Sequence, residues 1–208
     1  MPPDVPSRAV PADSLSSRAD FHACYSEWFG EPAGVWKTSY GDLCVYPPAS
    51  GQQPRFFTYL TAGMSLKKMK APSGAESNGR VELVFYAERQ DPRYVDALTL
   101  LMTFPFVDKT WLDFGHTVAL AEPIEDSGAL THVLLLRPLV RSHTEAFGTV
   151  RAHNEPVSYL WPVPITGSEL KLKKEQGVNA VLDVLEARRH PWVFSGGRRS
   201  YVLAEGER

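Results

Sequence analysis

The chain of 208 residues is 43% hydrophobic and 22% charged, a composition typical of soluble globular proteins. Its length suggests one large domain or two small ones, and a chain of this size buries enough surface to fold without a metal or a disulfide. The 22 basic and 24 acidic residues leave a formal net charge of −2, which argues against a general attraction to nucleic acid or to an anionic membrane. No stretch of the sequence has the length and apolarity of a membrane-spanning helix.

The first 12 residues contain four prolines and few apolar side chains. We therefore expect residues 1–12 to form an extended, mobile lead-in to a single domain over residues 13–208. They also lack the apolar segment of a signal peptide, which predicts a cytoplasmic location. Cys24 and Cys44 are the only cysteines, and we expect two buried free thiols, with a disulfide between them as the alternative.

The first half of the chain predicts one helix and four strands. A helix is expected from Asp13 or Ser14 to Phe29, because large apolar side chains recur on one side at helical spacing. Residues 35–46 predict a β-hairpin that turns at Gly41–Asp42. The runs Phe56–Thr61 and Val81–Ala87 show little alternation, which is typical of central strands covered on both faces.

The second half starts with a helix that Asp91–Pro92 opens and Pro105 ends. Residues Trp111–Glu125 mix aromatic and polar side chains and predict a long loop, where function often resides because a scaffold holds such loops at the surface. The apolar run His132–Leu136 predicts another buried strand, and Phe147–Val150 predicts a short edge strand.

The last strand is expected at Val157–Val163, and Pro162 and Pro164 predict that it lies at a sheet edge or leaves the sheet there. Thr166 begins a capping box that starts a helix, and Gly177 is expected to interrupt that helix. Neither repeats nor a change of composition divides the chain. The order of helix, strands, helix, strands and helix therefore predicts a single α+β domain with a mixed, mainly antiparallel sheet flanked by helices.

Sequence signatures of catalysis and of cofactor or zinc binding are absent, so we expect no cofactor and no metal. His116 has the most suggestive surroundings of the six histidines, since it follows Gly115 in the expected loop and Asp113 is close by. It could act as a general base, although no nucleophile stands out as its partner. The alternative is that its ring fixes the loop by bonding a backbone carbonyl.

The segment WVFSGGRR, residues 192–199, combines an aromatic residue, a Gly-Gly turn and two arginines. Backbone N–H groups of such a turn, together with Arg198, could hold a carboxylate or a phosphate. The alternative is a mobile, solvated turn near the C-terminus.

Six segments carry a resemblance to a known family. They are LCVYPP at Leu43–Pro48, TYLTAGMS at Thr58–Ser65, RVELVFYA at Arg80–Ala87, GHTV at Gly115–Val118, HVLLLRPL at His132–Leu139 and YLWPVPITGSELKLKKEQGVNAVLDVLE at Tyr159–Glu186. Each segment is short and apolar, but in this order and spacing they resemble the suppressor of fused domain family over most of residues 43–186.

The resemblance implies a protein-binding domain, because the family as a whole is not enzymatic. The animal member restrains transcription factors of the hedgehog pathway by gripping an extended peptide between this kind of domain and a second, C-terminal one. We do not expect that two-domain clamp here, since the chain ends soon after the first domain. Many bacterial members are proposed to be immunity proteins that neutralise toxins of polymorphic toxin systems, and this chain resembles those.

The resemblance also implies a location for the binding groove. In the animal protein the peptide contacts an aromatic residue at the end of the middle helix and an acidic residue beside the loop histidine. The matching positions are approximately Phe104 and Gly115–His116. Glycine replaces the acidic residue, with Asp113 nearby, and this departure weakens the case for transcription-factor binding. Residues 192–199 resemble a stretch near the end of the family domain, which implies that the tail packs on the domain.

The sequence therefore predicts a non-enzymatic protein-binding domain and, more specifically, a toxin-neutralising immunity protein that binds by strand addition to an exposed sheet edge. One alternative is a regulatory module that holds a transcription factor or another signalling protein in a peptide groove. Another is a hydrolase or transferase that uses the His116 loop. The expected partner is another protein, with no role for nucleic acid or membrane. The expected partner-binding residues are Phe104, Trp111, Asp113, Gly115, His116 and Arg198.

Overall fold

The computed structural model describes residues 14–75 and 77–202, so the expected lead-in at residues 1–12 lies outside the described residues. Within them, the helices are α1 (Arg18–Phe29), α2 (Pro92–Val107), α3 (Arg141–Phe147), α4 (Gly167–Gln176) and α5 (Val178–Ala187), with a short 3-10 turn η1 (Met64–Leu66). The strands are β1 (Gly34–Lys37), β2 (Asp42–Tyr46), β3 (Phe57–Ala62), β4 (Val81–Ala87), β5 (Thr117–Ala119), β6 (Leu130–Leu136), β7 (Arg151–Ala152), β8 (Glu155–Pro156) and β9 (Ser158–Thr166). In this part of the chain, no helix is long and apolar enough to cross a membrane.

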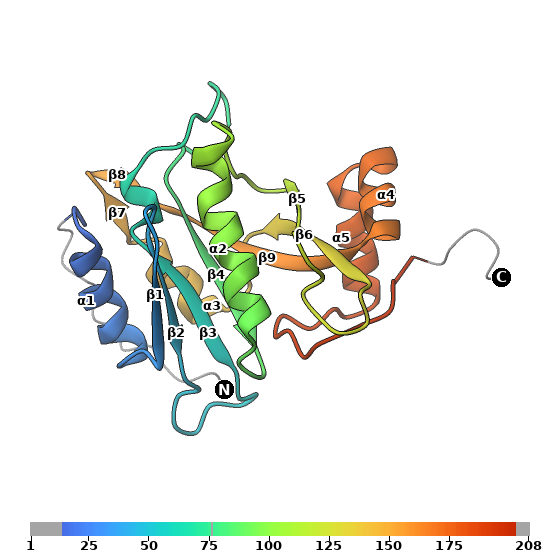
Figure 1. Ribbon diagram of the computed structural model, residues 1–208, viewed down its shortest axis with the longest axis horizontal. Helices are drawn as coiled ribbons and strands as arrows, with labels where there is room; N and C mark the ends of the chain where they lie inside the picture. Colours follow the sequence, from blue (N-terminus) through green and yellow to red (C-terminus); the bar gives the residue numbers. More distant parts are fainter. Residues whose placement is uncertain (1–13, 76, 203–208) are drawn as a thin grey trace.

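The strands form one seven-stranded sheet in the order β1-β2-β3-β4-β9-β6-β5 (Figure 1). β4 and β9 are parallel neighbours, and every other pair in the sheet is antiparallel. β7 and β8 form a separate two-stranded hairpin. This is the expected α+β fold with a mixed, mainly antiparallel sheet.

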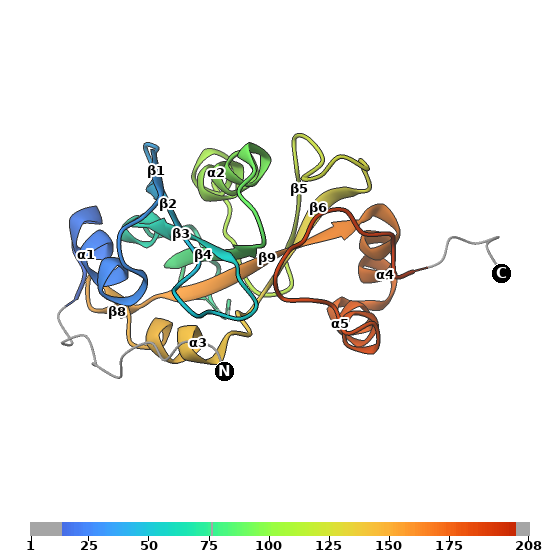
Figure 2. The same cartoon turned by 90° about the horizontal axis from the view of Figure 1, so that it is seen from below.

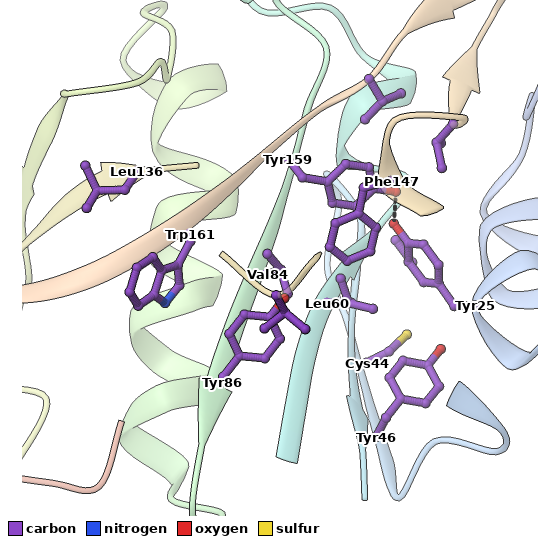
Figure 3. Close-up of a cluster of buried hydrophobic side chains, with 14 of the residues drawn as sticks. Tyr25, Cys44, Tyr46, Leu60, Val84, Tyr86, Leu136, Phe147, Tyr159 and Trp161 are labelled. Carbon is purple, nitrogen blue, oxygen red and sulfur yellow. Dashed lines mark hydrogen bonds between the residues drawn. The ribbon is translucent and has the colours of Figure 1, made fainter. Parts of the chain in front are cut away.

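Helices cover both faces of the sheet, with α2 on one face and α1, α3 and α5 on the other (Figure 2). Side chains along β4 alternate between two buried clusters. Val84 and Tyr86 belong to the cluster that contains residues of α1 and α3 (Figure 3) and of α5, whereas Leu83 and Phe85 pack with residues of α2. All seven residues of β4 are buried, which confirms the prediction of a central strand covered on both faces.

β9 lies inside the sheet and continues past its two prolines. It pairs with β4 only over residues 158–160, after which the two strands diverge and β9 continues along β6 alone. Pro162 and Pro164 lie in this second half, and the Pro164 carbonyl points away from β6 to accept a hydrogen bond from Arg198 (3.0 Å). The missing N–H groups of the prolines therefore remove no ladder bond. The expected exit from the sheet at these prolines is wrong, whereas the alternative of an edge holds locally, since β6 is the one partner strand of β9 there among the described residues.

The first helix begins later than expected. α1 starts at Arg18, where the Ser17 side chain accepts a hydrogen bond from the Asp20 N–H and the Asp20 carboxylate accepts one from the Ser17 N–H. This reciprocal capping box satisfies two N–H groups that the first turn leaves without helical partners. The expected start at Ser14 is therefore wrong, and the alternative start at Asp13 lies outside the described residues.

Three other expectations are wrong. α2 continues past Pro105, because the Asp108 N–H still closes a helical bond on Phe104 (2.9 Å). Residues 147–150 are the end of α3 and the turn after it rather than an edge strand, and buried Phe147 stacks on Tyr159 with ring centroids 4.0 Å apart. The expected loop 111–125 contains β5, which is only three residues long and has no alternating pattern to reveal it.

Several local predictions are confirmed. β1 and β2 form the expected hairpin. Thr166 and Glu169 form the capping box of α4, and Gly177, with a φ of 87°, separates α4 from α5. Cys24 and Cys44 are buried free thiols.

Candidate protein-binding site

β5 is the last strand of the sheet on its side, and β6 is its only partner strand among the described residues. The His116 carbonyl accepts a hydrogen bond from Leu135 (2.9 Å), and the Leu120 N–H donates one to β6 (2.9 Å). Bonded and non-bonded pairs alternate along an antiparallel ladder. The N–H and C=O groups of Thr117 and Ala119 therefore point away from β6 and form an open edge.

α2 lies beside the segment that contains β5, and the two run in opposite directions (Figure 1). At one end, the Arg93 guanidinium bonds the Asp126 carboxylate at 2.6 Å. Toward the other end, Phe104 on α2 and Trp111 before β5 pack against the same buried cluster. The face of α2 that carries Arg93, Ala97, Leu100 and Phe104, spaced at i, i+4, i+7 and i+11, therefore points toward the segment that contains β5.

A cleft of about 490 Å³ lies between α2 and the connection that follows β5. We call it the α2 cleft. Its walls are Arg93, Asp96, Ala97 and Leu100 from α2 and residues 120–123, 125, 126 and 128 from the connection. Leu120 belongs both to the wall of the cleft and to the end of the β5 ladder, so the cleft adjoins the open edge.

The loop before β5 is held in one conformation by Asp113. Asp113 is 6% exposed, and its carboxylate accepts hydrogen bonds from the N–H groups of Ser77 (3.1 and 3.2 Å) and Phe114 (2.9 Å). Its carbonyl accepts one from the N–H of His116 (3.2 Å). Gly115 has a φ of +77°, which a residue with a side chain rarely adopts. Asp113 therefore fixes the loop instead of projecting freely toward a partner.

The aromatic side chains of this loop divide between the two faces of the sheet. Trp111 packs on the α2 side, and the His116 ring lies edge-on against it with ring centroids 5.1 Å apart. Phe114 packs on the opposite side. Together with Asp113 it lines a second, smaller hollow of about 210 Å³ beside α3 and the start of β9. Trp111 and His116 therefore lie together just before β5, and Phe104 lies on the face of α2 that points toward this segment. Asp113 lines the other hollow instead of the α2 cleft.

Arg198 lies elsewhere, in the tail. Its guanidinium bonds both carboxylate oxygens of Glu169 (2.6 and 2.7 Å) and the Pro164 carbonyl (3.0 Å), and it lies over the ring of Tyr201 at 4.2 Å. The tail itself is fixed where Phe194 pairs with the end of β4. The tail thus packs on the domain, on the side of β9 where β4 no longer pairs with it. Arg198 does not line the α2 cleft.

The fold also assembles a Cys–His–Asp arrangement that sequence reasoning missed. Cys44 Sγ lies 3.6 Å from His22 Nδ1, and His22 Nε2 lies 2.9 Å from the carboxylate of Asp42, which also bonds Arg18. A thiolate nucleophile requires a lowered pKa and access for a substrate. Burial instead raises the pKa of the fully buried Cys44 thiol to about 12. Asp42 and Cys44 share β2, but His22 comes from α1, so no spacing in the sequence could have revealed the group.

A metal site is not apparent in residues 14–75 and 77–202, where no three His, Cys, Asp or Glu side chains come together in a ligand-like group. The imidazole of His116 makes no hydrogen bond to any described residue. The groups that β5 and its surroundings offer to a partner are therefore exposed backbone N–H and C=O groups, aromatic side chains and the carboxylates of the α2 cleft.

Comparison with known proteins shows the family to which the fold belongs. The model of the family described as Suppressor of fused protein (SUFU) matches residues 38–199, which is most of the chain. The chain belongs to the suppressor of fused family. No curated protein matches it by sequence.

Two solved structures of the family share the fold. One is the crystal structure of a proposed SUFU homolog from Neisseria gonorrhoeae FA 1090, with a TM-score of 0.63 and 14% identity over 89% of this chain and 99% of that one. The other is the Sufu-Fu complex, also with a TM-score of 0.63 and 14% identity, over 91% of this chain and 93% of that one. At this identity the similarity establishes the fold, and the function has to be argued from the site.

Proposed function

We propose that this chain is a non-catalytic domain that binds another protein by adding an extended segment of that protein to β5. The proposal rests on the open edge of β5, where the outward N–H and C=O groups of Thr117 and Ala119 have no partner strand among the described residues. The crystal structure of the Sufu-Fu complex supports it, since a protein of similar fold was crystallised there in a complex.

The surroundings of β5 suit strand addition. Main-chain hydrogen bonds supply affinity in this binding mode, and side-chain pockets beside the edge supply selectivity. Trp111 and His116, just before β5, and Phe104, in the last turn of α2, are all half-buried. A partner can therefore cover their exposed parts without any change in how they pack. Aromatic side chains of this kind contribute much of the energy of protein interfaces.

We propose further that the partner is a toxin domain and that the chain is its immunity protein. The support is the resemblance of the sequence to bacterial members of the family, many of which are proposed to neutralise toxins. A domain of this kind acts by occupying a surface of the toxin and needs no catalytic group of its own.

The test is coexpression of this chain in a bacterial host with the toxin-like protein encoded beside its gene. The wild-type chain should restore growth, and Ala119→Pro should not. Proline at position 119 removes an outward N–H group and places a ring on the open edge, while the bonds to β6 are made by neighbouring residues. The melting temperature should therefore change by only a few degrees.

The matched control is Trp36→Ser, at the opposite edge of the sheet, where Trp36 is 40% exposed on β1. This variant should protect as well as the wild type. Protection by Ala119→Pro together with its loss in Trp36→Ser would place the binding edge at β1 and contradict the proposal. Absence of a toxin-like neighbour, combined with binding to a transcription factor or other signalling protein, would replace the immunity role by the regulatory alternative.

A hydrolase or transferase built on His116 has less support. A general base needs the proton that it abstracts within hydrogen-bond reach, and the His116 ring instead packs against Trp111. Turnover that His116→Ala abolishes at an unchanged melting temperature would revive this alternative.

A further inference from the structure

The α2 cleft beside β5 combines an apolar floor with acidic walls. Ala97 and Leu100 of α2 face Leu120 and Pro123 of the connection across it. Ala97 is buried and the other three are half-buried. α2 and the start of the β5–β6 connection lie on the same side of the sheet (Figure 2), and Leu120, at the end of the β5 ladder, also lines the cleft.

Four of the five charged side chains that line the α2 cleft are acidic. The one cation, Arg93, is already bonded to two carboxylates, those of Asp91 (2.7 Å) and Asp126 (2.6 Å). Glu125 is 4% exposed and accepts hydrogen bonds from the N–H groups of Ser127, Ala129 and Leu130, so it fixes the connection.

The two remaining carboxylates, Asp96 and Glu122, are exposed and form no ion pair with any described residue. Asp96 comes from α2 and Glu122 from the connection, so one unpaired negative charge stands on each wall. A long basic side chain matches this arrangement, because its methylene stem can lie along an apolar floor while its cationic head reaches carboxylates at the rim.

We propose that the segment added to β5 carries a lysine or arginine whose side chain lies in the α2 cleft between Asp96 and Glu122. This inference rests on the proposed function and names the chemistry of its partner. Main-chain pairing with Thr117 and Ala119 places the segment, and the cleft selects the basic side chain. The partner is thus an extended, basic stretch of another protein.

The experiment selects random heptapeptides displayed on phage against the immobilised chain, and measures the dissociation constant of the most enriched peptide by fluorescence anisotropy. We expect the enriched peptides to carry lysine or arginine. Binding to the double variant Asp96→Asn/Glu122→Gln should be about three- to tenfold weaker at low salt, since exposed charge pairs contribute modestly, and the difference should shrink as salt rises.

The matched control removes two exposed carboxylates from α5, on the other face of the sheet, in the variant Asp183→Asn/Glu186→Gln. It should bind like the wild type. A second control replaces the basic residue of the peptide by methionine, which should weaken binding to the wild-type chain but not to Asp96→Asn/Glu122→Gln.

The outcomes separate the two claims. If peptides bind, and Ala119→Pro abolishes their binding, but they lack basic residues or bind Asp96→Asn/Glu122→Gln as tightly as the wild type, the charge inference is overturned and the β5 proposal stands. If no peptide is enriched, or if Ala119→Pro binds normally, both are overturned.

Discussion

At the scale of single residues, two fully buried glutamates show how neighbouring groups decide the cost of a buried charge. Glu82 accepts hydrogen bonds from Thr61, Gly63 and Ser65, all neutral donors, and thereby holds the turn between β3 and η1. Burial raises the pKa of Glu82 to about 7, although these bonds act to lower it. For Glu169, burial also acts to raise the pKa, but the bonds from Arg198 and from backbone N–H groups outweigh it and hold the pKa below its usual value.

The raised pKa of Glu82 predicts a pH-dependent stability. Between pH 4.5, the ordinary pKa of a glutamate, and about pH 7, the Glu82 carboxyl group stays protonated in the folded chain but loses its proton in the unfolded chain. Its contribution to stability is therefore fully present below pH 4.5 and is lost as the pH rises through 7. The loss should amount to about 3 kcal/mol.

Glu82→Gln, which cannot ionise, should not show this loss. The free energy of unfolding of the variant relative to the wild type should rise by about 3 kcal/mol between pH 4.5 and pH 8 in urea titrations. A difference that stays constant across this range would contradict the assignment.

At the scale of elements, the tail is held by the ion pair of Arg198 with Glu169, whose side chains are 13% and 0% exposed. Removing one partner of a buried pair leaves the other charge unpaired in the interior, which typically costs several kcal/mol. Arg198→Ala should therefore lower the free energy of unfolding by about 3 kcal/mol, measured by urea denaturation.

The control for this prediction is Arg199→Ala, because Arg199 is exposed. It should change the free energy of unfolding by less than about 0.5 kcal/mol. If Arg198→Ala left stability unchanged but weakened peptide binding, the tail arginine would be a partner contact, as the sequence suggested.

At the scale of the whole molecule, one sheet separates two cores, and five of its strands, β2, β3, β4, β6 and β9, contribute side chains to both. Leu60 on β3 belongs to the core beneath α1, α3 and α5, and Leu83 on β4 belongs to the core beneath α2. The two strands are antiparallel neighbours, so neither core can be lost without exposing the backbone that supports the other.

Leu60→Ala and Leu83→Ala should therefore each lower the free energy of unfolding by about 2–5 kcal/mol, as expected for buried leucines. Each should do so within a single transition that fluorescence and far-UV circular dichroism report at the same urea concentration. Separate transitions for the two probes in either variant would show that the cores unfold independently.

The amino-acid sequence by itself determined the local structure that side-chain pattern controls. The unbroken apolar runs predicted β3 and β4 as strands covered on both faces, because a strand buried on both faces does not alternate between apolar and polar residues. Thr166 and Gly177 predicted the start of α4 and its break from α5, because caps act over a few neighbouring residues. Family resemblance pointed to Phe104, in the last turn of α2, and to His116, immediately before β5.

Only the tertiary structure decided which segments far apart in the sequence meet. β5 is a strand because β6 pairs with it, and β9 tolerates Pro162 and Pro164 because β4 diverges from it. Asp96 and Glu122 share a cleft because α2 and the connection after β5 pack side by side. These outcomes depend on burial and pairing summed over the whole chain, which no local window of residues contains.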